Sequence, residues 1–167
     1  EKVVKRQIKQ DPSGLNYRVD LGIVYRASGD ESKARSQFEK TIKEFALGQE
    51  QAVNLANAFM AVKEWDYAIA TYRRANKMMG GMYPFNFEVA EVYSAKGDVA
   101  AMINEYLEVL EINESYLQSV QNALQTNFGK DGDAKKNDIL KTELLKRIQK
   151  SSDKIIYSEM LIWMMMQ

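Results

Sequence analysis

The chain has 167 residues, of which 46% are hydrophobic and 28% charged, enough for a domain with a sizeable apolar core. Lys plus Arg number 23 and Asp plus Glu number 23, so no overall positive charge attracts nucleic acid or an anionic membrane. The sequence contains no Cys and no His, which excludes disulfides, thiol nucleophiles, imidazole bases and the usual zinc ligands. The acidic turn Asp131-Gly132-Asp133 has Lys135 and Lys136 where a calcium loop needs an oxygen ligand and Gly, so we expect no bound metal, and we expect no cofactor.

The first segment, residues 1–12, is predicted to be the second helix of an incomplete repeat. Its apolar residues Val4 and Ile8 lie 34 residues before Phe38 and Ile42, which belong to a later helix of the same pattern. These first residues lack the apolar run of a secretory signal.

A 34-residue frame then recurs three times, over 15–48, 49–82 and 83–116. Each repeat has a pair of small or aliphatic residues followed by an aromatic residue, and then a second apolar set. The first positions are Leu21-Gly22 with Tyr25, Leu55-Ala56 with Phe59, and Val89-Ala90 with Tyr93. The second set is Ala34, Phe38 and Thr41, then Ala68, Tyr72 and Ala75, then Met102, Tyr106 and Val109. Spacings of three, four and seven place each set on one helical face, so each repeat is predicted to be two amphipathic helices.

The turns inside the repeats carry helix-ending and helix-starting residues. Gly29-Asp30 and Gly97-Asp98 each combine a Gly that tolerates left-handed backbone with an Asp that can cap the next helix. The second repeat has Lys63-Glu64 at this place, with no Gly. A turn is therefore expected at Lys63-Glu64 only because the 34-residue repeat places one there.

The last part of the chain keeps the frame less cleanly. Residues 117–154 are predicted to be a degenerate fourth repeat, in which Asn127 replaces the aromatic residue. Its turn, 129–137, is four residues longer, and Asp133 is expected to cap the following helix. Residues 155–167 are predicted to be the first helix of a truncated repeat, apolar on nearly all sides but too short to cross a bilayer. Because the chain stops inside this helix, we expect a domain of a longer protein.

Together these residues resemble the tetratricopeptide repeat (TPR) family. The resemblance rests on Leu21-Gly22, Tyr25, Gly29-Asp30, Ala34 and Phe38, with Pro12 ahead of them, and covers residues 1–167. Arg18 departs from it, because the family favours Trp at that position. The resemblance implies an all-α fold: one right-handed superhelical solenoid domain of antiparallel helix pairs, whose first helices line a concave groove.

By register with the family, the groove is predicted to bind a protein or peptide segment. The residues that it would present are Asn16, Val19, Ile23, Arg26, Glu50, Val53, Asn57, Met60, Phe87, Glu91, Ser94, Gln121 and Gln125. An apolar stripe within this mixed wall suits an amphipathic helix or an extended segment with a few apolar anchors.

The alternative function is a structural module. In it, the apolar last helix packs on the rest of a longer chain or on another copy through Trp163, Met164 and Met166. An enzyme is not expected, because the sequence has no phosphate-binding loop or dinucleotide fingerprint. Nor is a nucleic-acid partner expected, because the basic residues of 130–154 have no aromatic residue among them to stack on a base. No membrane span is expected.

Overall fold

The computed structural model describes residues 1–44, 48–129, 134–151 and 153–166. Within these ranges every regular element is helical, which confirms the predicted all-α class. The chain divides into two compact units, 1–85 and 86–167, and each is described by itself. The predicted cap Asp133 lies outside the described residues.

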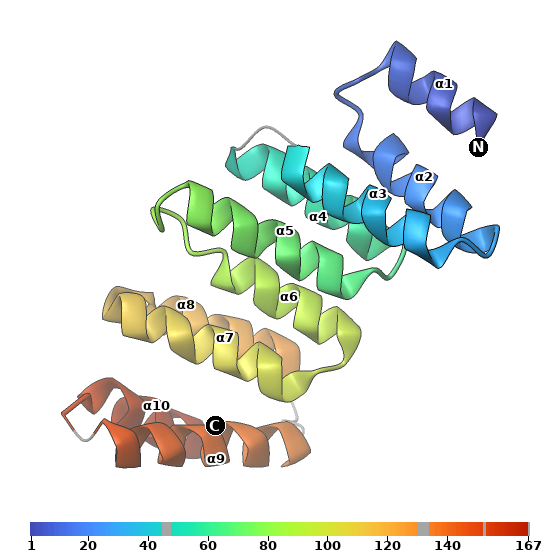
Figure 1. Ribbon diagram of the computed structural model, residues 1–167. Helices are drawn as coiled ribbons and strands as arrows, with labels where there is room; N and C mark the ends of the chain where they lie inside the picture. The colour runs from blue at the N-terminus through green and yellow to red at the C-terminus, as the bar shows by residue number, and fades with distance from the viewer. Residues whose placement is uncertain (45–47, 130–133, 152, 167) are drawn as a thin grey trace. The chain divides into compact units, whose positions relative to one another are not determined.

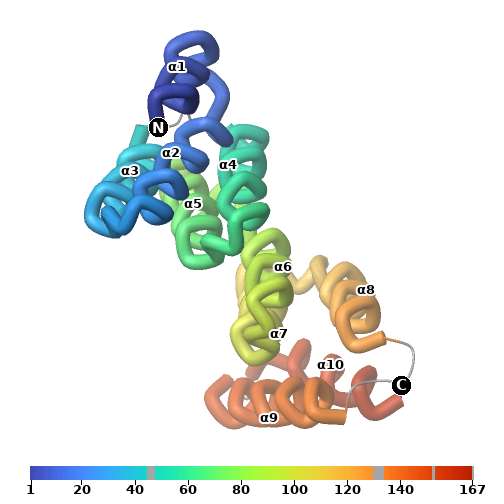
Figure 2. Tube along the Cα trace, turned by 90° about the vertical axis from the view of Figure 1, so that its right-hand side faces the viewer, coloured from blue at the N-terminus to red at the C-terminus, as the bar shows by residue number. Residues whose placement is uncertain are grey.

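The first unit holds five helices in its described residues: α1 (Lys2–Gln10), α2 (Leu15–Ala27), α3 (Glu31–Glu44), α4 (Gln49–Ala61) and α5 (Trp65–Met78). Helices α2 and α3 form one antiparallel pair, and α4 and α5 form the next (Figure 1). The first helices α2 and α4 contact each other, as do the second helices α3 and α5 (Figure 2). Helix α1 packs on α2, where the sequence predicts the second helix of an incomplete repeat.

The described part of the second unit contains α6 (Asn86–Lys96), α7 (Val99–Ile112), a short 3-10 turn η1 (Glu114–Tyr116), α8 (Leu117–Phe128), α9 (Ala134–Lys150) and α10 (Ile155–Met165). Its closest pairs are α6 with α7 and α9 with α10. Helix α9 also packs on α7, and α8 contacts η1, α7 and α10. The frame predicts α9 as the second helix of the fourth repeat, yet its main partners are α10 and α7.

Three turns at 34-residue intervals share the same backbone bonds, so the repeat in the sequence is also a repeat in structure. In each, the left-handed residue donates its N–H to the carbonyl three residues back, at 2.9–3.0 Å: Gly29 to Arg26, Lys63 to Met60, and Gly97 to Ser94. The next N–H reaches back five residues at the same range of distances, from Asp30 to Tyr25, Glu64 to Phe59, and Asp98 to Tyr93. Lys63 takes φ +60° where its counterparts are Gly at +83°. The turn without Gly therefore forms as the frame predicts, with Lys in a conformation that costs roughly 1–2 kcal/mol.

Two of these turns are completed by the predicted caps. The Oδ1 atom of Asp30 accepts from the Lys33 N–H at 3.0 Å, and that of Asp98 accepts from the Ala101 N–H at 3.1 Å. Both bonds satisfy an amide that has no partner within its own helix. Helix α5, which begins after Glu64, has no side-chain cap bond.

The core of the first unit is built around aromatic rings and small residues. Phe38 and Phe59 are fully buried and meet edge to face, with centroids 5.5 Å apart. Tyr67 packs against both rings, at 4.9 and 5.6 Å. Gly22 lies against the Phe38 ring, so close that a Cβ atom would overlap it. Small residues at the predicted positions therefore let the aromatic rings lie between the helices.

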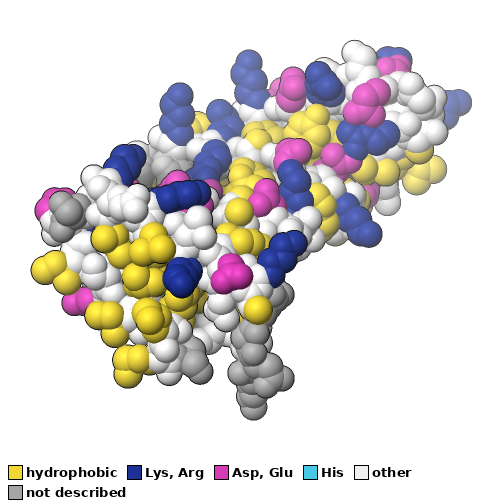
Figure 3. All heavy atoms as spheres, turned by 90° about the horizontal axis from the view of Figure 1, so that it is seen from below, with side chains coloured by type: hydrophobic (Ala, Val, Ile, Leu, Met, Phe, Trp, Pro, Cys, Tyr) yellow, Lys and Arg dark blue, Asp and Glu magenta, His cyan; other side chains and the backbone are white. Residues whose placement is uncertain are grey.

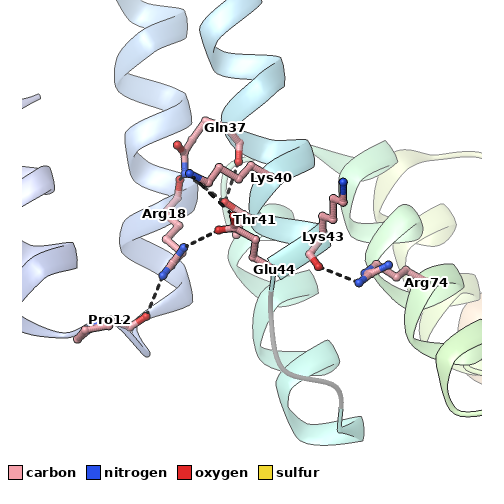
Figure 4. A network of polar contacts seen from close by, with 8 residues as sticks. All are labelled: Pro12, Arg18, Gln37, Lys40, Thr41, Lys43, Glu44 and Arg74. Atoms are coloured by element: carbon pink, nitrogen blue, oxygen red, sulfur yellow. Dashed lines mark hydrogen bonds and ion pairs between the residues drawn. The ribbon is translucent and has the colours of Figure 1, made fainter.

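Polar contacts hold the end of α3 to its neighbours in this unit (Figure 4). Arg18 on α2 donates to the Pro12 carbonyl at 3.2 Å and approaches Glu44 at 3.5 Å. Arg74 on α5 donates to the Lys43 carbonyl at 2.8 Å. A guanidinium is favourable there because the last carbonyls of a helix lack intrahelical donors and carry partial negative charge. Arg18, at the position where the TPR family favours Trp, thus connects α2 to α3 by a polar contact with Glu44.

Candidate functional site

In the first unit, the predicted groove residues lie along one stripe on each first helix. On α4, Glu50 and Asn57 are exposed, and Val53 and Met60 beside them are half-buried. On α2, Asn16 is exposed and Ile23 half-buried. Helices α2 and α4 also contact each other.

Val19 differs from its neighbours on the predicted wall. Its side chain is only 1% exposed, so it belongs to the core of the first unit. The helical register placed Val19 one turn before Ile23 on the groove face. Val19 is covered because α2 packs against three helices, α1, α3 and α4. We correct the prediction accordingly and leave Val19 out of the site.

Arg26 is held by contacts within the unit. Its guanidinium makes two hydrogen bonds of 2.8 Å to the Glu31 carboxylate and an ion pair with Glu64. It also lies over the Phe38 ring, 5.3 Å from the centroid. The hydrogen bonds from Arg26 lower the pKa of Glu31. Arg26 therefore links α2 to the starts of α3 and α5, and this role explains the residue without a ligand.

In the second unit, three predicted residues of α6 lie one turn apart on a single face: Phe87, Glu91 and Ser94. Phe87 meets the Tyr116 ring, at the start of α8, with centroids 6.0 Å apart. Ser94 donates a hydrogen bond of 2.9 Å to Oδ1 of Asn127, near the end of α8. The α6 face is thus joined to α8 at both ends, by an aromatic contact at one and a polar contact at the other.

Tyr106 of α7 lies beneath these two contacts. Its ring is 5.8 Å from that of Phe87, and its hydroxyl accepts from Nδ2 of Asn127 at 3.2 Å. Asn127 also donates to the Ala123 carbonyl at 2.9 Å, so its amide is fixed by three side-chain bonds. Burial is the main cause that raises the pKa of Tyr106, which therefore stays a neutral phenol at physiological pH.

We call Phe87, Glu91, Ser94, Tyr106, Tyr116 and Asn127 the α6–α8 site. Sequence reasoning found its α6 residues but assigned Tyr106 to packing and gave Tyr116 no role. The signal for Asn127 was present, because it is a polar residue at a frame position that holds an aromatic residue in three repeats. The other predicted residues of α8 are Gln121, which is half-buried, and Gln125, which is exposed. Neither lies on the side of α8 that carries Tyr116 and Asn127.

The electrostatics of the α6–α8 site centre on Glu91. Glu91 is exposed, yet partial desolvation raises the pKa of its carboxyl above the usual 4.5. The charge of Glu88, three residues earlier on α6, raises this pKa further. Among the described residues, no cation contributes to the shift.

A separate hollow of about 490 Å³ lies on the other side of the first unit, between the second helices α3 and α5. Its lining mixes charges of both signs, with Arg35, Lys43 and Arg74 beside Glu39 and Asp66. Neither helix belongs to the predicted groove. This hollow is the natural comparison surface for any binding experiment.

The residues predicted for self-association lie at the end of α10, with Met166 directly after its last residue. Trp163 and Met164 are half-buried and pack on the core of the second unit, whereas Met166 is 79% exposed. Ile155, Ile162 and Met165 are exposed as well. Seen from below, hydrophobic side chains gather on this face of the molecule (Figure 3). The exposed apolar surface of α10 is thus real, although two of the three predicted residues are partly covered.

In the part of the chain that the structure describes, no three acidic residues are grouped so as to hold a metal ion. No helix among the same residues has both the length and the apolar character needed to cross a bilayer.

Repeated turns, paired helices and the 34-residue frame define a TPR-like helical-repeat fold in the all-α class. No protein-family model matches the chain, and no curated protein matches it. Among solved structures, the chain is similar to one titled "Crystal structure of MamA", with 20% sequence identity and a TM-score of 0.43. That alignment covers 90% of this chain and 88% of the other.

Proposed function

We propose that this chain is a non-enzymatic scaffold that binds a segment of a partner protein along the exposed faces of its first helices. The α6–α8 site is the observation that carries the proposal. It combines two half-buried aromatic rings, Phe87 and Tyr116, with the exposed polar groups of Glu91 and Ser94. Apolar anchors beside hydrogen-bonding groups are typical of surfaces that hold a peptide segment.

The internal hydrogen bonds of this site favour a binding role because they fix its shape before a partner arrives. Asn127 is held by Ser94 and Tyr106, so little side-chain freedom remains to be lost on binding. Ordering a flexible side chain costs about 0.5–1.5 kcal/mol, which a prearranged group avoids. The stripes on α2 and α4 would provide a similar, more polar surface in the first unit.

Peptide-display selection on the whole chain tests this function. Peptides selected from a randomised library would be measured against Asn57→Arg on α4 and Ser94→Arg on α6, both exposed positions of the proposed face. We expect at least one of these variants to weaken binding by about tenfold, equivalent to about 1.4 kcal/mol. Lys40→Glu on α3 and Glu108→Arg on α7, exposed positions of second helices, are the matched controls. Peptides weakened by the controls and not by the face variants would contradict the proposal.

The exposed apolar residues of α10 favour a second candidate, self-association. Isolated apolar residues on a surface are ordinary, but neighbouring ones on one helix often mark a contact. Light scattering over a concentration series would detect it. A dimer that Met166→Glu abolishes would support this function, and a chain that stays monomeric up to high concentration would exclude it.

A further inference from the structure

The position of Glu91 follows from its neighbours on α6. Phe87 lies one turn before it and Ser94 one turn after it, and both side chains reach α8. Glu91 therefore lies between them, on the face that α6 turns toward α8. On α8, the two residues that reach α6, Tyr116 and Asn127, are separated by Val120 and Ala123 at the same helical spacing.

The two α8 residues between Tyr116 and Asn127 are apolar. Val120 is fully buried in the core of the second unit, and Ala123 packs against that core. Neither side chain can donate a hydrogen bond or compensate a negative charge. Desolvation is the first cause of the raised pKa of Glu91, and its charge also acts on the Tyr106 hydroxyl of the same site.

A second negative charge adds to the first. Glu88 is three residues from Glu91 on the same helix, a spacing at which like charges repel. Glu91 therefore presents a negative charge on the same face of α6 as Phe87. A cation placed there would be attracted both by the carboxylate and by the electron-rich faces of the aromatic rings.

We propose that Glu91, together with the rings of Phe87 and Tyr116, binds one basic side chain, Lys or Arg, of the bound partner segment. The cation pairs with the Glu91 carboxylate, and its aliphatic stem packs on the two rings. This inference rests on the proposed function and names the chemistry of the partner at the same site. An acidic partner residue would be repelled by the Glu91 carboxylate, and a neutral polar one would not compensate its charge.

Selection from the same randomised library, run against the wild-type chain, Glu91→Gln and Glu91→Arg, tests the inference. The wild type is expected to enrich one fixed Lys or Arg, and Glu91→Arg is expected to enrich Asp or Glu at that position. In a synthetic copy of the selected peptide, replacing the basic residue by Gln should weaken wild-type binding about tenfold or more, equivalent to about 1.4 kcal/mol. The same replacement should change binding to Glu91→Gln less than about twofold. Glu108→Gln, an exposed carboxylate on α7, is the matched control and should behave as the wild type.

The outcomes separate this inference from the proposed function. Peptides that perturb the backbone amide signals of α6 and α8 but show no basic preference would overturn the inference alone. So would a basic preference that survives Glu91→Gln. Failure to select any peptide, or perturbations confined to α3, α5 and α9, would overturn both. Glu91 is exposed, so folding of the two variants is expected to persist and is checked by circular dichroism.

Discussion

Asn127 of α8 donates a hydrogen bond from Nδ2 to the hydroxyl of Tyr106 on α7, across 3.2 Å. Tyr106 is only 2% exposed, so this bond satisfies a polar atom inside the core of the second unit. In the three earlier repeats the position of Asn127 holds Tyr25, Phe59 or Tyr93. The residue that looks like a loss of the repeat pattern is therefore a polar link between helices.

Replacing Asn127 by Ala is expected to destabilise the chain by about 1–3 kcal/mol, because the Tyr106 hydroxyl loses its partner in a buried place. The urea dependence of helical circular dichroism measures this change. Asn122→Ala, an exposed position on the same helix, is the control and should cost less than about 0.5 kcal/mol. Equal losses of stability in Asn127→Ala and Asn122→Ala would show that the hydrogen bond between Asn127 and Tyr106 does not stabilise the fold.

Replacing Lys63 by Gly should stabilise the chain, by up to about 1 kcal/mol. Lys63 has φ +60°, and Gly relieves the steric cost of that conformation while losing more backbone entropy on folding. The unfolding midpoint in urea is the measurement. Lys77→Gly, in the last turn of α5, should instead destabilise by about 1 kcal/mol. A loss of stability with Lys63→Gly would mean that the turn carries no strain.

Replacing Gly22 by Ala is expected to cost about 1–3 kcal/mol, because the added methyl group overlaps the Phe38 ring. Thermal unfolding of the variant gives the change. The substitution Phe38→Leu removes the ring and costs stability by itself, but the added cost of Gly22→Ala should then shrink. If the two costs simply add, Gly22 and Phe38 are not in the contact described here.

Glu91 should titrate above pH 4.5, and Glu88→Gln should lower its pKa, because the substitution removes the like charge on α6. The carboxyl carbon signal of Glu91 in an NMR titration reports this directly. A raised pKa in the folded state also means that the contribution of Glu91 to stability is greatest below its ordinary pKa. That contribution falls as the pH rises through the folded-state value. A midpoint for Glu91 at or below pH 4.5 would disprove the desolvation described for the α6–α8 site.

Much of the fold could be predicted because the repeated residues determine helix faces and helix ends through neighbours close in the sequence. Ala34, Phe38 and Ala68 are buried at the positions that helical spacing indicates, and Asp30 and Asp98 cap the helices that follow them. These outcomes depend on side chains within one or two turns of each other. A frame that repeats three times makes the same local prediction three times.

Other features depend on which helices come together, and the sequence frame alone does not determine that. Val19 lies on the line of residues predicted for the groove but is covered in the packed unit. The link between Ser94, Asn127 and Tyr106 joins three helices, so no single helical pattern reveals it. The pairing of α9 with α10 likewise follows from packing.

Mapping a selected peptide on the isotope-labelled chain by NMR tests the central claim most directly, because it reports which helices touch the peptide. We predict that its largest chemical-shift changes fall on the exposed faces of first helices, on α6 and α8 of the second unit, with Glu91 and Ser94 among them. Changes concentrated on α3 and α5, around Arg35 and Lys43, would contradict the claim and place binding in the hollow between those second helices.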